Sequence, residues 1–374
     1  MIPKNVREGA VTDGLPGERR AFTIAANGKA FRTLIDGLYS NKVRAVTREL
    51  WSNALDSHIE AGIPLVPFET SVPTNLEPTF RVRDFGVGLT HDQVMNLYTT
   101  IFQSTKEETN DQTGQLGLGS KSPFAYTDSF CVTCFSGYDK RVYIAHIATD
   151  GVPQITHVET ISTTEPRGVE VSFAVKREDM RQFANEAQFV SIGFDVKPIM
   201  SGMDLKVPVP RLAGNNWAIY GSSAFGVDVH DRNFIRQGCV AYPNNTISVP
   251  GLGYNWVTVI DVPIGTADIT ASREALSYDS DTVNALKNII NTVGKDIVVH
   301  VEEEVAKATT RREVAMVWME FNGVFSNRRG STLVSLLDDP NHPASRKPGD
   351  LLSHAWEIGS NRKYVSRVSQ SIEV

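Results

Sequence analysis

The segment RELWSNALDSH places an acid, an amide and a second acid at helical spacing. Glu49, Asn53 and Asp56 stand at positions i, i+4 and i+7, so a helix carries them on one face, beside an apolar stripe that includes Val46. An ordinary amphipathic helix keeps its carboxylates on the opposite side. Half-buried polar groups are costly unless a polar partner lies against them. The pattern predicts a site for a cation and a water molecule, and a helix with a polar edge is the alternative.

These side-chain types also define the chemistry that such a site would support. A carboxylate beside a bound water can act as a general base. The carbonyl oxygen of an asparagine suits a hard cation such as Mg²⁺. Glu49 is therefore the candidate base, and Asn53 is the candidate metal ligand.

A second motif, FRVRDFGVGLTHDQV, follows about thirty residues later. An apolar strand is predicted to deliver Asp84, and Gly86 and Gly88 then permit a tight turn and a close approach of the backbone to a ligand. A buried carboxylate at a strand end can accept a hydrogen bond from an amino group such as the exocyclic amine of adenine. Taken alone, D-x-G-x-G is also a common turn.

The third motif, TGQLGLGSKSPFAY, comes within one residue of a nucleotide-binding P-loop. Gly114 and Gly119 have the P-loop spacing, but Ser120 occupies the lysine position and Lys121 comes one place late. A P-loop also follows an apolar strand, whereas KEETNDQT precedes this segment. We therefore predict a glycine-rich turn that opens a helix at residues 120–126, where backbone N–H groups can bind an anion.

The elements that position these motifs can be predicted from the pattern of apolar residues. The pattern is helical from Lys29 to Ala61 and again over residues 91–102. Residues 103–114 are polar and are predicted to form a loop. Strands are expected within the following segments: 68–85, 128–147 and 167–175. Up to about residue 200 this is an α+β arrangement of a mixed sheet with helices.

A second unit is predicted after a segment rich in proline and glycine. Its strands are expected in CVAYP and WVTVIDVPIG, and a helix is expected over residues 280–310. The predicted domains are 1–200, 201–320 and a C-terminal segment 321–374 with a weak basic bias. Two or three domains also agree with the length of 374 residues.

Composition narrows the class of protein further. The chain is 41% hydrophobic and has a net charge of −6, which disfavours nucleic acid as a partner. No apolar run is long enough to span a bilayer, and the first residues lack the apolar region of a signal peptide. Three cysteines provide no disulfide framework, which is typical of a reducing cytoplasm. Cys131 and Cys134 lack a second pair at zinc-site spacing and are predicted to lie in a strand.

The order of the three motifs resembles that of the GHKL ATPases, which include DNA gyrase, the ninety-kilodalton heat-shock chaperones, histidine kinases and MutL. YSNKVRAVTRELWSNALD resembles the first nucleotide-binding helix of the chaperones, and GQLGLGSKS resembles their glycine-rich box. This resemblance implies a Bergerat ATP-binding sandwich of a mixed sheet and helices, followed by a smaller α/β transducer-like domain and a short tail. It implies ATP and Mg²⁺ as cofactors. No phospho-acceptor histidine helix precedes the motifs, which disfavours a histidine kinase.

The resemblance also implies a role for each matching residue. Glu49 would activate water, Asn53 would bind Mg²⁺, Asp56 would support the same network, and Asp84 would accept from the adenine amine. Residues 103–115 would form a lid over ATP. The residues implied to shape the base pocket or contact the phosphates are Gly86, Gly88, Lys106, Gly114, Gly117, Gly119, Ser120 and Lys121.

Two further positions are compared with the same family. A Gly-Thr near the last strand supports adenine in GHKL proteins, and here Gly168 is followed by Val169, which has no hydroxyl. In the chaperone branch, a Ser-Arg-Glu after the second-domain strands directs its arginine to the γ-phosphate. The matching residue is Arg273, which would stabilise charge that develops on phosphate. A solvated arginine behind a capping Ser272 is the alternative.

Over most of its length the chain resembles the RIIA-type proteins of tailed bacteriophages. The resemblance is carried by GLYSNKVRAVTRELWSNALDSHIEAG, RVRDFGVGLTHDQVMNLYTTIFQSTK, LGLGSKSPFAYTDSF, DGVPQI and DVPIGTADITASREALSYD. It implies a role in lysis regulation and in resistance to prophage exclusion, with a phage or host protein as partner. It also implies the host cytoplasm, with association at the inner membrane for some members. Residues 1–22 would cross to a second subunit, which would give a homodimer.

Three functions are compatible with the sequence. The first is an ATP-hydrolysing, dimeric, nucleotide-gated switch. The second is a nucleotide-gated binding module that scarcely turns over, which the missing hydroxyl at Val169 favours. The third is a DNA-associated ATPase of the MutL or topoisomerase kind, which the net charge and the absence of a basic stripe disfavour.

Overall fold

The fold combines two β-sheets with helices, and the predicted α+β class is confirmed. The computed structural model describes residues 28–99, 119–226, 233–244, 246–249, 252, 256–270, 272, 274–310, 313, 316–317 and 320–321. The helices are α1 (Gly28–Leu38), α2 (Lys42–Glu60), α3 (His91–Thr99), α4 (Met180–Val190) and α5 (Ser280–Lys307), with short 3₁₀ helices η1 (Gly119–Ala125), η2 (Arg177–Asp179) and η3 (Ser191–Gly193).

The first sheet has the strand order β5-β4-β3-β6-β2-β1-β7. Neighbouring strands run antiparallel except β1 and β7, which run parallel, so this sheet is mixed. The strands are β1 (Glu69–Ser71), β2 (Thr79–Arg83), β3 (Ser129–Phe135), β4 (Asp139–Ile147), β5 (Pro153–Ser162), β6 (Gly168–Ala174) and β7 (Ile199–Ser201). Cys131 and Cys134 both lie in β3, as the sequence predicts.

The second sheet has the order β11-β10-β12-β9-β8 and is also mixed, because β10 and β12 run parallel. Its strands are β8 (Leu212–Ala213), β9 (Trp217–Gly221), β10 (Asn233–Gln237), β11 (Val240–Pro243) and β12 (Trp256–Val262). The first sheet takes its strands from residues up to 201 and the second from residue 212 on. The boundary predicted at 200 lies next to this change of sheet and stays a prediction.

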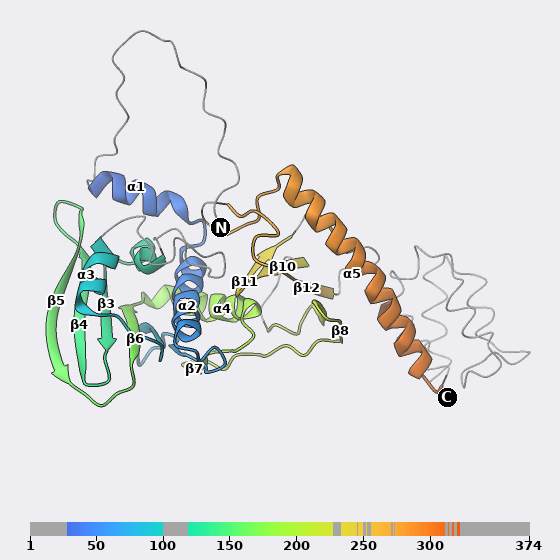
Figure 1. The fold of residues 1–374 in the computed structure, drawn as a ribbon, viewed down its shortest axis with the longest axis horizontal. Helices are drawn as coiled ribbons and strands as arrows, with labels where there is room; N and C mark the ends of the chain where they lie inside the picture. Colours follow the sequence, from blue (N-terminus) through green and yellow to red (C-terminus); the bar gives the residue numbers. More distant parts are fainter. Residues whose placement is uncertain are drawn as a thin grey trace, which may run out of the picture.

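Helix α2 lies at the centre of the described fold, beside α4 (Figure 1). Its Trp51 side chain is fully buried and packs edge to face on Phe68 and Phe194, with ring centroids 5.7 and 5.5 Å apart. Burial on more than one side explains why polar residues of α2, among them Glu49 and Asp56, are inside the protein. The helix is therefore held rigidly by its surroundings, which is what a site built on it requires.

The helical pattern predicted from Lys29 to Ala61 is divided into two helices. The break falls at Tyr39–Asn41, and Asn41 takes up extended backbone angles before α2. Its side-chain oxygen accepts a 3.1 Å hydrogen bond from the backbone N–H of Arg44. An asparagine in this position satisfies one of the unpaired N–H groups at a helix start, so the local sequence favours a new helix here.

The helix predicted at residues 120–126 is a 3₁₀ helix, η1, rather than an α-helix. Pro123 lies inside it and has no N–H group to donate, which favours a short, tight turn over a continued α-helix. The aromatic ring of Phe124 in η1 packs against Phe31 of α1 and Phe130 of β3, with centroids 5.6 and 4.8 Å apart. These contacts attach the end of the glycine-rich motif to the core.

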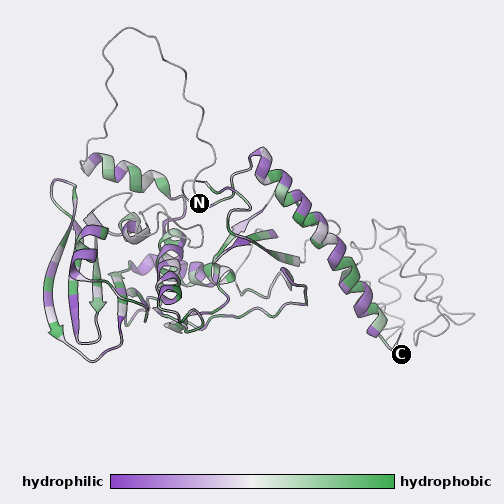
Figure 2. Cartoon of the chain, viewed as in Figure 1, coloured by the Kyte–Doolittle hydropathy of each residue, from purple (hydrophilic) through white to green (hydrophobic). Residues whose placement is uncertain are grey.

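Helix α5 covers the second sheet and was predicted at residues 280–310. Asp279 caps it by accepting a 2.8 Å hydrogen bond from the N–H of Thr282. Hydrophobic and hydrophilic residues alternate along it (Figure 2), and its buried positions recur at helical spacing. Trp217 of β9 donates a 2.7 Å hydrogen bond to Asp296 of this helix. Among the helices of the described ranges, none has both the length and the apolar character needed to cross a membrane.

Candidate functional site

Helix α2 brings parts of all three sequence motifs together. At its centre, Glu49 and Asn53 face the glycine-rich motif: a Cβ atom placed on Gly119 would lie 2.9 Å from Oε2 of Glu49 and 3.5 Å from Oδ1 of Asn53. Two turns after Glu49, Ser57 donates a 3.0 Å hydrogen bond to Asp84 of the second motif. The three motifs are separated in the sequence, and one helix joins them in space.

Asp84 lies directly after β2 and is 6% exposed. Its Oδ1 atom accepts hydrogen bonds from the hydroxyl of Ser57 (3.0 Å) and the N–H of Gly86 (2.9 Å). Its Oδ2 atom accepts one from the N–H of Val169 (3.1 Å). Burial raises the pKa of Asp84, and the hydrogen bonds from Gly86 and Ser57 oppose that rise. The carboxylate is thus fixed in one orientation before any ligand binds.

The turn after Asp84 is packed closely enough to require glycine at several positions. Gly88 has φ = 69°, and a Cβ atom there would lie 2.9 Å from the carbonyl oxygen of Phe135 and 3.4 Å from the N atom of Gly168. Gly168 has φ = 136°, and a Cβ atom there would overlap the carbonyl oxygen of Asp84. Gly86 packs in the same manner on Ser57. These close approaches leave no room for side chains around Asp84.

Gly168 and Val169 therefore lie beside Asp84, at the start of β6. The backbone N–H of Asp84 also donates to the carbonyl oxygen of Val169 (2.9 Å). Val169 thus contacts the aspartate through its main chain, although it has no hydroxyl. Arg83 reinforces this arrangement: it donates to the carbonyl oxygens of Asp84 and Pro166, and its guanidinium lies 3.8 Å from the ring centroid of Phe135.

Two polar groups at the glycine-rich end of the site differ in their surroundings. In the part of the chain that the structure describes, the hydroxyl of Ser120 is buried and has no hydrogen-bond partner. The hydroxyl of Ser122, in the same 3₁₀ helix, is also buried without a partner among the described residues, and such a group can be satisfied by a bound water or ligand. Lys121 is 1% exposed, and burial lowers its pKa to about 8. A lysine enclosed by the core in this way is a poor candidate for a P-loop lysine.

The candidate base Glu49 is 2% exposed and forms an ion pair with its neighbour Arg48. The Nη2 atom of Arg48 lies 3.1 Å from Oε1 of Glu49, and the same nitrogen donates to the carbonyl oxygen of Ser272 (3.3 Å). Asp56, the second acid of the motif, is also 2% exposed. Neither Arg48 nor Ser57 stands out in the sequence, because their roles depend on contacts with distant residues.

The segment around Ser272 is held to the start of α2. Glu274 accepts hydrogen bonds from the N–H and hydroxyl of Ser40 (both 2.9 Å) and from the N–H of Asn41 (3.1 Å). A carboxylate is favourable at a helix N-terminus, where N–H groups are unpaired. The predicted Arg273 lies outside the described residues; its neighbour Ser272 contacts Arg48, the residue that is paired with Glu49.

Several predicted residues have no described position. Lys106, Gly114, Gly117 and the predicted lid at 103–115 lie outside the described residues, as do the strap at 1–22 and all of 321–374 except Phe321. Among the residues that are described, no group of three or more His, Cys, Asp or Glu side chains is arranged to hold a metal ion.

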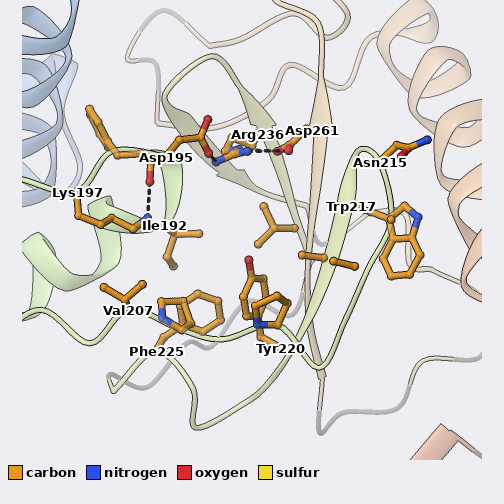
Figure 3. Close-up of a pocket in the computed structure, with 17 residues that line it drawn as sticks. Ile192, Asp195, Lys197, Val207, Asn215, Trp217, Tyr220, Phe225, Arg236 and Asp261 are labelled. Carbon is orange, nitrogen blue, oxygen red and sulfur yellow. Dashed lines mark hydrogen bonds and ion pairs between the residues drawn. The ribbon is translucent and has the colours of Figure 1, made fainter. Parts of the chain in front are cut away.

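A pocket with a volume of about 380 Å³ lies between strands of the second sheet and the segment from Ile192 to Pro210. At its polar end, Arg236 of β10 donates to both carboxylate oxygens of Asp261 (2.5 and 2.7 Å) and to Asp195 (2.5 Å). Val207, Tyr220 and Phe225 line the opposite side (Figure 3). Because two carboxylates neutralise Arg236, this pocket suits a phosphate group poorly.

Comparison with known proteins assigns no family to this arrangement. No protein-family model matches the chain, and no curated protein matches it. The residues of the site and the resemblance of its motifs are therefore the grounds for assigning a function.

Proposed function

We propose that the chain binds ATP with Mg²⁺ on helix α2 and hydrolyses it, as an ATPase that resembles the GHKL superfamily. The observation that carries this proposal is the convergence on one helix: Gly119 packs on Glu49 and Asn53, and Ser57 holds Asp84. The adenine ring of ATP would lie at the Asp84 end of the helix, and its phosphates would lie at the Gly119 end. The unpartnered hydroxyl of Ser120 supports a polar ligand at that second end.

The residues around Asp84 would recognise adenine. One lone pair of the Asp84 carboxylate would accept a hydrogen bond from the exocyclic amine, and the closely packed glycines would let the base approach the backbone. Because three protein donors already orient Asp84, little conformational freedom is lost when the ligand binds.

The residues at the other end fit a magnesium-bound triphosphate. Mg²⁺ commonly takes one or two protein ligands and completes its coordination with phosphate oxygens and water, so Asn53 can serve as the single protein ligand. When bound, the metal would neutralise phosphate charge. Glu49 would accept a proton from the attacking water, and that water would add to the γ-phosphorus as the bond to ADP breaks.

The ion pair with Arg48 provides a restraint on this reaction. A carboxylate that is bound by a guanidinium is a weaker proton acceptor, because its charge is neutralised. The same guanidinium donates to Ser272, so movement of residues 272–274 would alter the environment of Glu49. We infer that turnover is coupled to the position of this segment, and that Arg273 completes the site when the segment docks.

A second candidate function is a nucleotide-gated binding module with little turnover. The Arg48–Glu49 ion pair favours this function, because the general base Glu49 is paired in this conformation. The missing hydroxyl at Val169 also favours it. A DNA-associated ATPase is the least favoured, given the net charge of −6.

The cellular role is proposed from the resemblance of the motifs to the RIIA-type phage proteins. It is a dimeric switch in lysis regulation or in the response to prophage exclusion. The switch would act through a phage or host protein in the host cytoplasm.

Steady-state ATP turnover with Mg²⁺ tests the enzymatic proposal. The wild-type chain should release phosphate, and Glu49→Gln should reduce the rate at least a hundredfold while binding of a non-hydrolysable ATP analogue persists. Glu60→Gln, a change of the same kind on the exposed end of α2, is the matched control and should leave turnover unaltered. If wild type and Glu49→Gln bind the analogue and are equally inactive, the second candidate replaces the first.

A further inference from the structure

Ser57 is a residue of α2 that lies within the first motif but has no role assigned from the sequence. It lies four residues after Asn53, and its hydroxyl reaches across 27 sequence positions to Oδ1 of Asp84 at 3.0 Å. The other two groups that donate to Asp84 are the backbone N–H groups of Gly86 and Val169. Among these three donors, Ser57 is therefore the one that a change of side chain can remove or replace.

The arrangement of these donors restricts what Asp84 can accept from a ligand. A carboxylate has about four lone-pair positions, two on each oxygen. Ser57 and Gly86 occupy both positions on Oδ1, and Val169 occupies one on Oδ2. Counting the donors among the described residues, one position, on Oδ2, is left for a ligand. Asp84 in this state accepts a single N–H.

Adenine and guanine differ in the number of donors that they present. Adenine offers its exocyclic amine beside a ring nitrogen that is an acceptor, so one hydrogen bond to a carboxylate suffices. Guanine offers two neighbouring donors, N1–H and the 2-amine, which need both carboxylate oxygens, and its 6-carbonyl is an acceptor that a carboxylate repels. A carboxylate with Oδ1 filled therefore matches adenine and not guanine.

We propose that Ser57 is a positioning and specificity-determining residue that fills Oδ1 of Asp84 and thereby selects adenine over guanine nucleotides. The proposal rests on the proposed nucleotide-binding function of this site. It also accounts for Val169, because the side-chain hydroxyl that contacts the aspartate comes from α2 instead of from the strand after Gly168. Ser57 has a second effect: its hydrogen bond favours the ionised form of Asp84 against the effect of burial.

The test compares Ser57→Ala with Ser57→Thr, which keeps a hydroxyl, in the full chain. Calorimetry with the Mg²⁺ complexes of the non-hydrolysable analogues AMP-PNP and GMP-PNP should show about tenfold weaker AMP-PNP binding for Ser57→Ala, because Asp84 loses the side-chain donor that orients it before the ligand binds. The preference for AMP-PNP over GMP-PNP should fall by more than tenfold, since a freed position on Oδ1 admits guanine. Ser57→Thr should retain most of the affinity for AMP-PNP and most of the preference for AMP-PNP over GMP-PNP. Ser52→Ala, on the same helix, is the control and should resemble wild type.

A second measurement needs no ligand and tests the contact itself. Loss of the Ser57 hydrogen bond should raise the pKa of Asp84 further. An acid whose pKa is higher in the folded than in the unfolded state loses stability as pH rises between the two values, because the folded state then retains a proton that the unfolded state has released. The melting temperature of Ser57→Ala should therefore fall relative to Ser57→Thr as pH rises through the range between the pKa values of Asp84 in the two folded variants, which lies above about 4, the unfolded pKa of Asp, and the two curves should run parallel at lower pH.

Each result decides a different question. Parallel melting curves for Ser57→Ala and Ser57→Thr at all pH values would overturn the role of Ser57. Wild-type binding of AMP-PNP with an unchanged preference in Ser57→Ala would overturn the selection of adenine and leave the proposed nucleotide site intact. Absence of AMP-PNP binding to the wild type would overturn both the proposed function and the selectivity, while the melting curves would still report on the contact.

Discussion

The guanidinium of Arg48 lies 3.1 Å from the carboxylate of Glu49, and their side chains are only 6% and 3% exposed. Both residues belong to the same helix, and Arg48 also donates to the carbonyl oxygen of Ser272. The residue proposed as the base is thereby connected to the segment that follows the second sheet. This contact explains how a change in one unit could alter chemistry in the other.

Removal of Arg48 tests the strength of this pairing. Arg48→Met should lower the free energy of unfolding by about 3 kcal/mol, because it removes the guanidinium that neutralises a buried carboxylate. The double variant Arg48→Met, Glu49→Gln should recover much of that loss, since neither charge is then present. Urea unfolding of wild type, both single variants and the double variant measures the coupling. Additive losses would mean that the ion pair contributes nothing.

The contact between Gly119 and Glu49 leads to a prediction about nucleotide binding. Gly119→Ala should weaken AMP-PNP binding by at least tenfold, because its Cβ would lie 2.9 Å from Oε2 of Glu49 and force one of them to move. Lys121→Met should weaken binding less, because Lys121 is enclosed in the core. Calorimetry on the two variants compares them directly. A larger loss for Lys121→Met would mean that this lysine binds phosphate after all.

The buried Lys121 should make stability depend on alkaline pH. Burial lowers its pKa to about 8, against 10.5 for an ordinary lysine. Between these two values the unfolded chain holds a proton that the folded chain has released, so stability should rise with pH in this window. Relative to Lys121→Met, wild type should gain at most ~1.4 kcal/mol per pH unit from pH 8 to 10.5. A constant difference across this range would show that the amine is not desolvated.

The carboxylate of Glu274 should control how residues 272–274 attach to α2. Glu274→Ala removes the acceptor for Ser40 and Asn41, so hydrogen exchange in the first turn of α2 should become faster. ATP turnover should fall with little change in AMP-PNP affinity, since the segment that carries Arg273 would be displaced. Asp281→Ala, at the start of α5, serves as the control for loss of an exposed acid. Unchanged turnover in Glu274→Ala would separate this segment from the reaction.

Much of the site could be predicted from the sequence because its parts are local. Glu49 and Asn53 share a face through helical spacing alone, and Asp84 follows a recognisable apolar strand. The contacts of Ser57 and Arg48 could not be predicted in this way. Ser57 meets Asp84 across 27 positions, and Arg48 meets Ser272 across 224, so both pairs depend on the tertiary structure.

The same distinction applies to the fold. The strands β2, β3, β4, β6 and β12 were predicted because apolar and β-branched residues mark them. Strand β5 was not predicted, and the reason is visible in its burial: almost every residue from Gln154 to Ser162 is exposed or half-exposed, so no alternation of apolar and polar residues develops. The break at Tyr39–Asn41 was also missed, since apolar positions continue at helical spacing on both sides of it.

Binding of Mg²⁺-AMP-PNP to wild type and to Asp84→Asn tests the central claim most directly. Wild type should give a saturable, one-site calorimetric signal. A loss of at least a hundredfold is expected for Asp84→Asn, whose amide presents a donor where the carboxylate accepts. A melting curve of the variant that matches wild type would show that the loss is local. Equal affinity of the two proteins for AMP-PNP, or no binding by a folded wild type, would contradict the account.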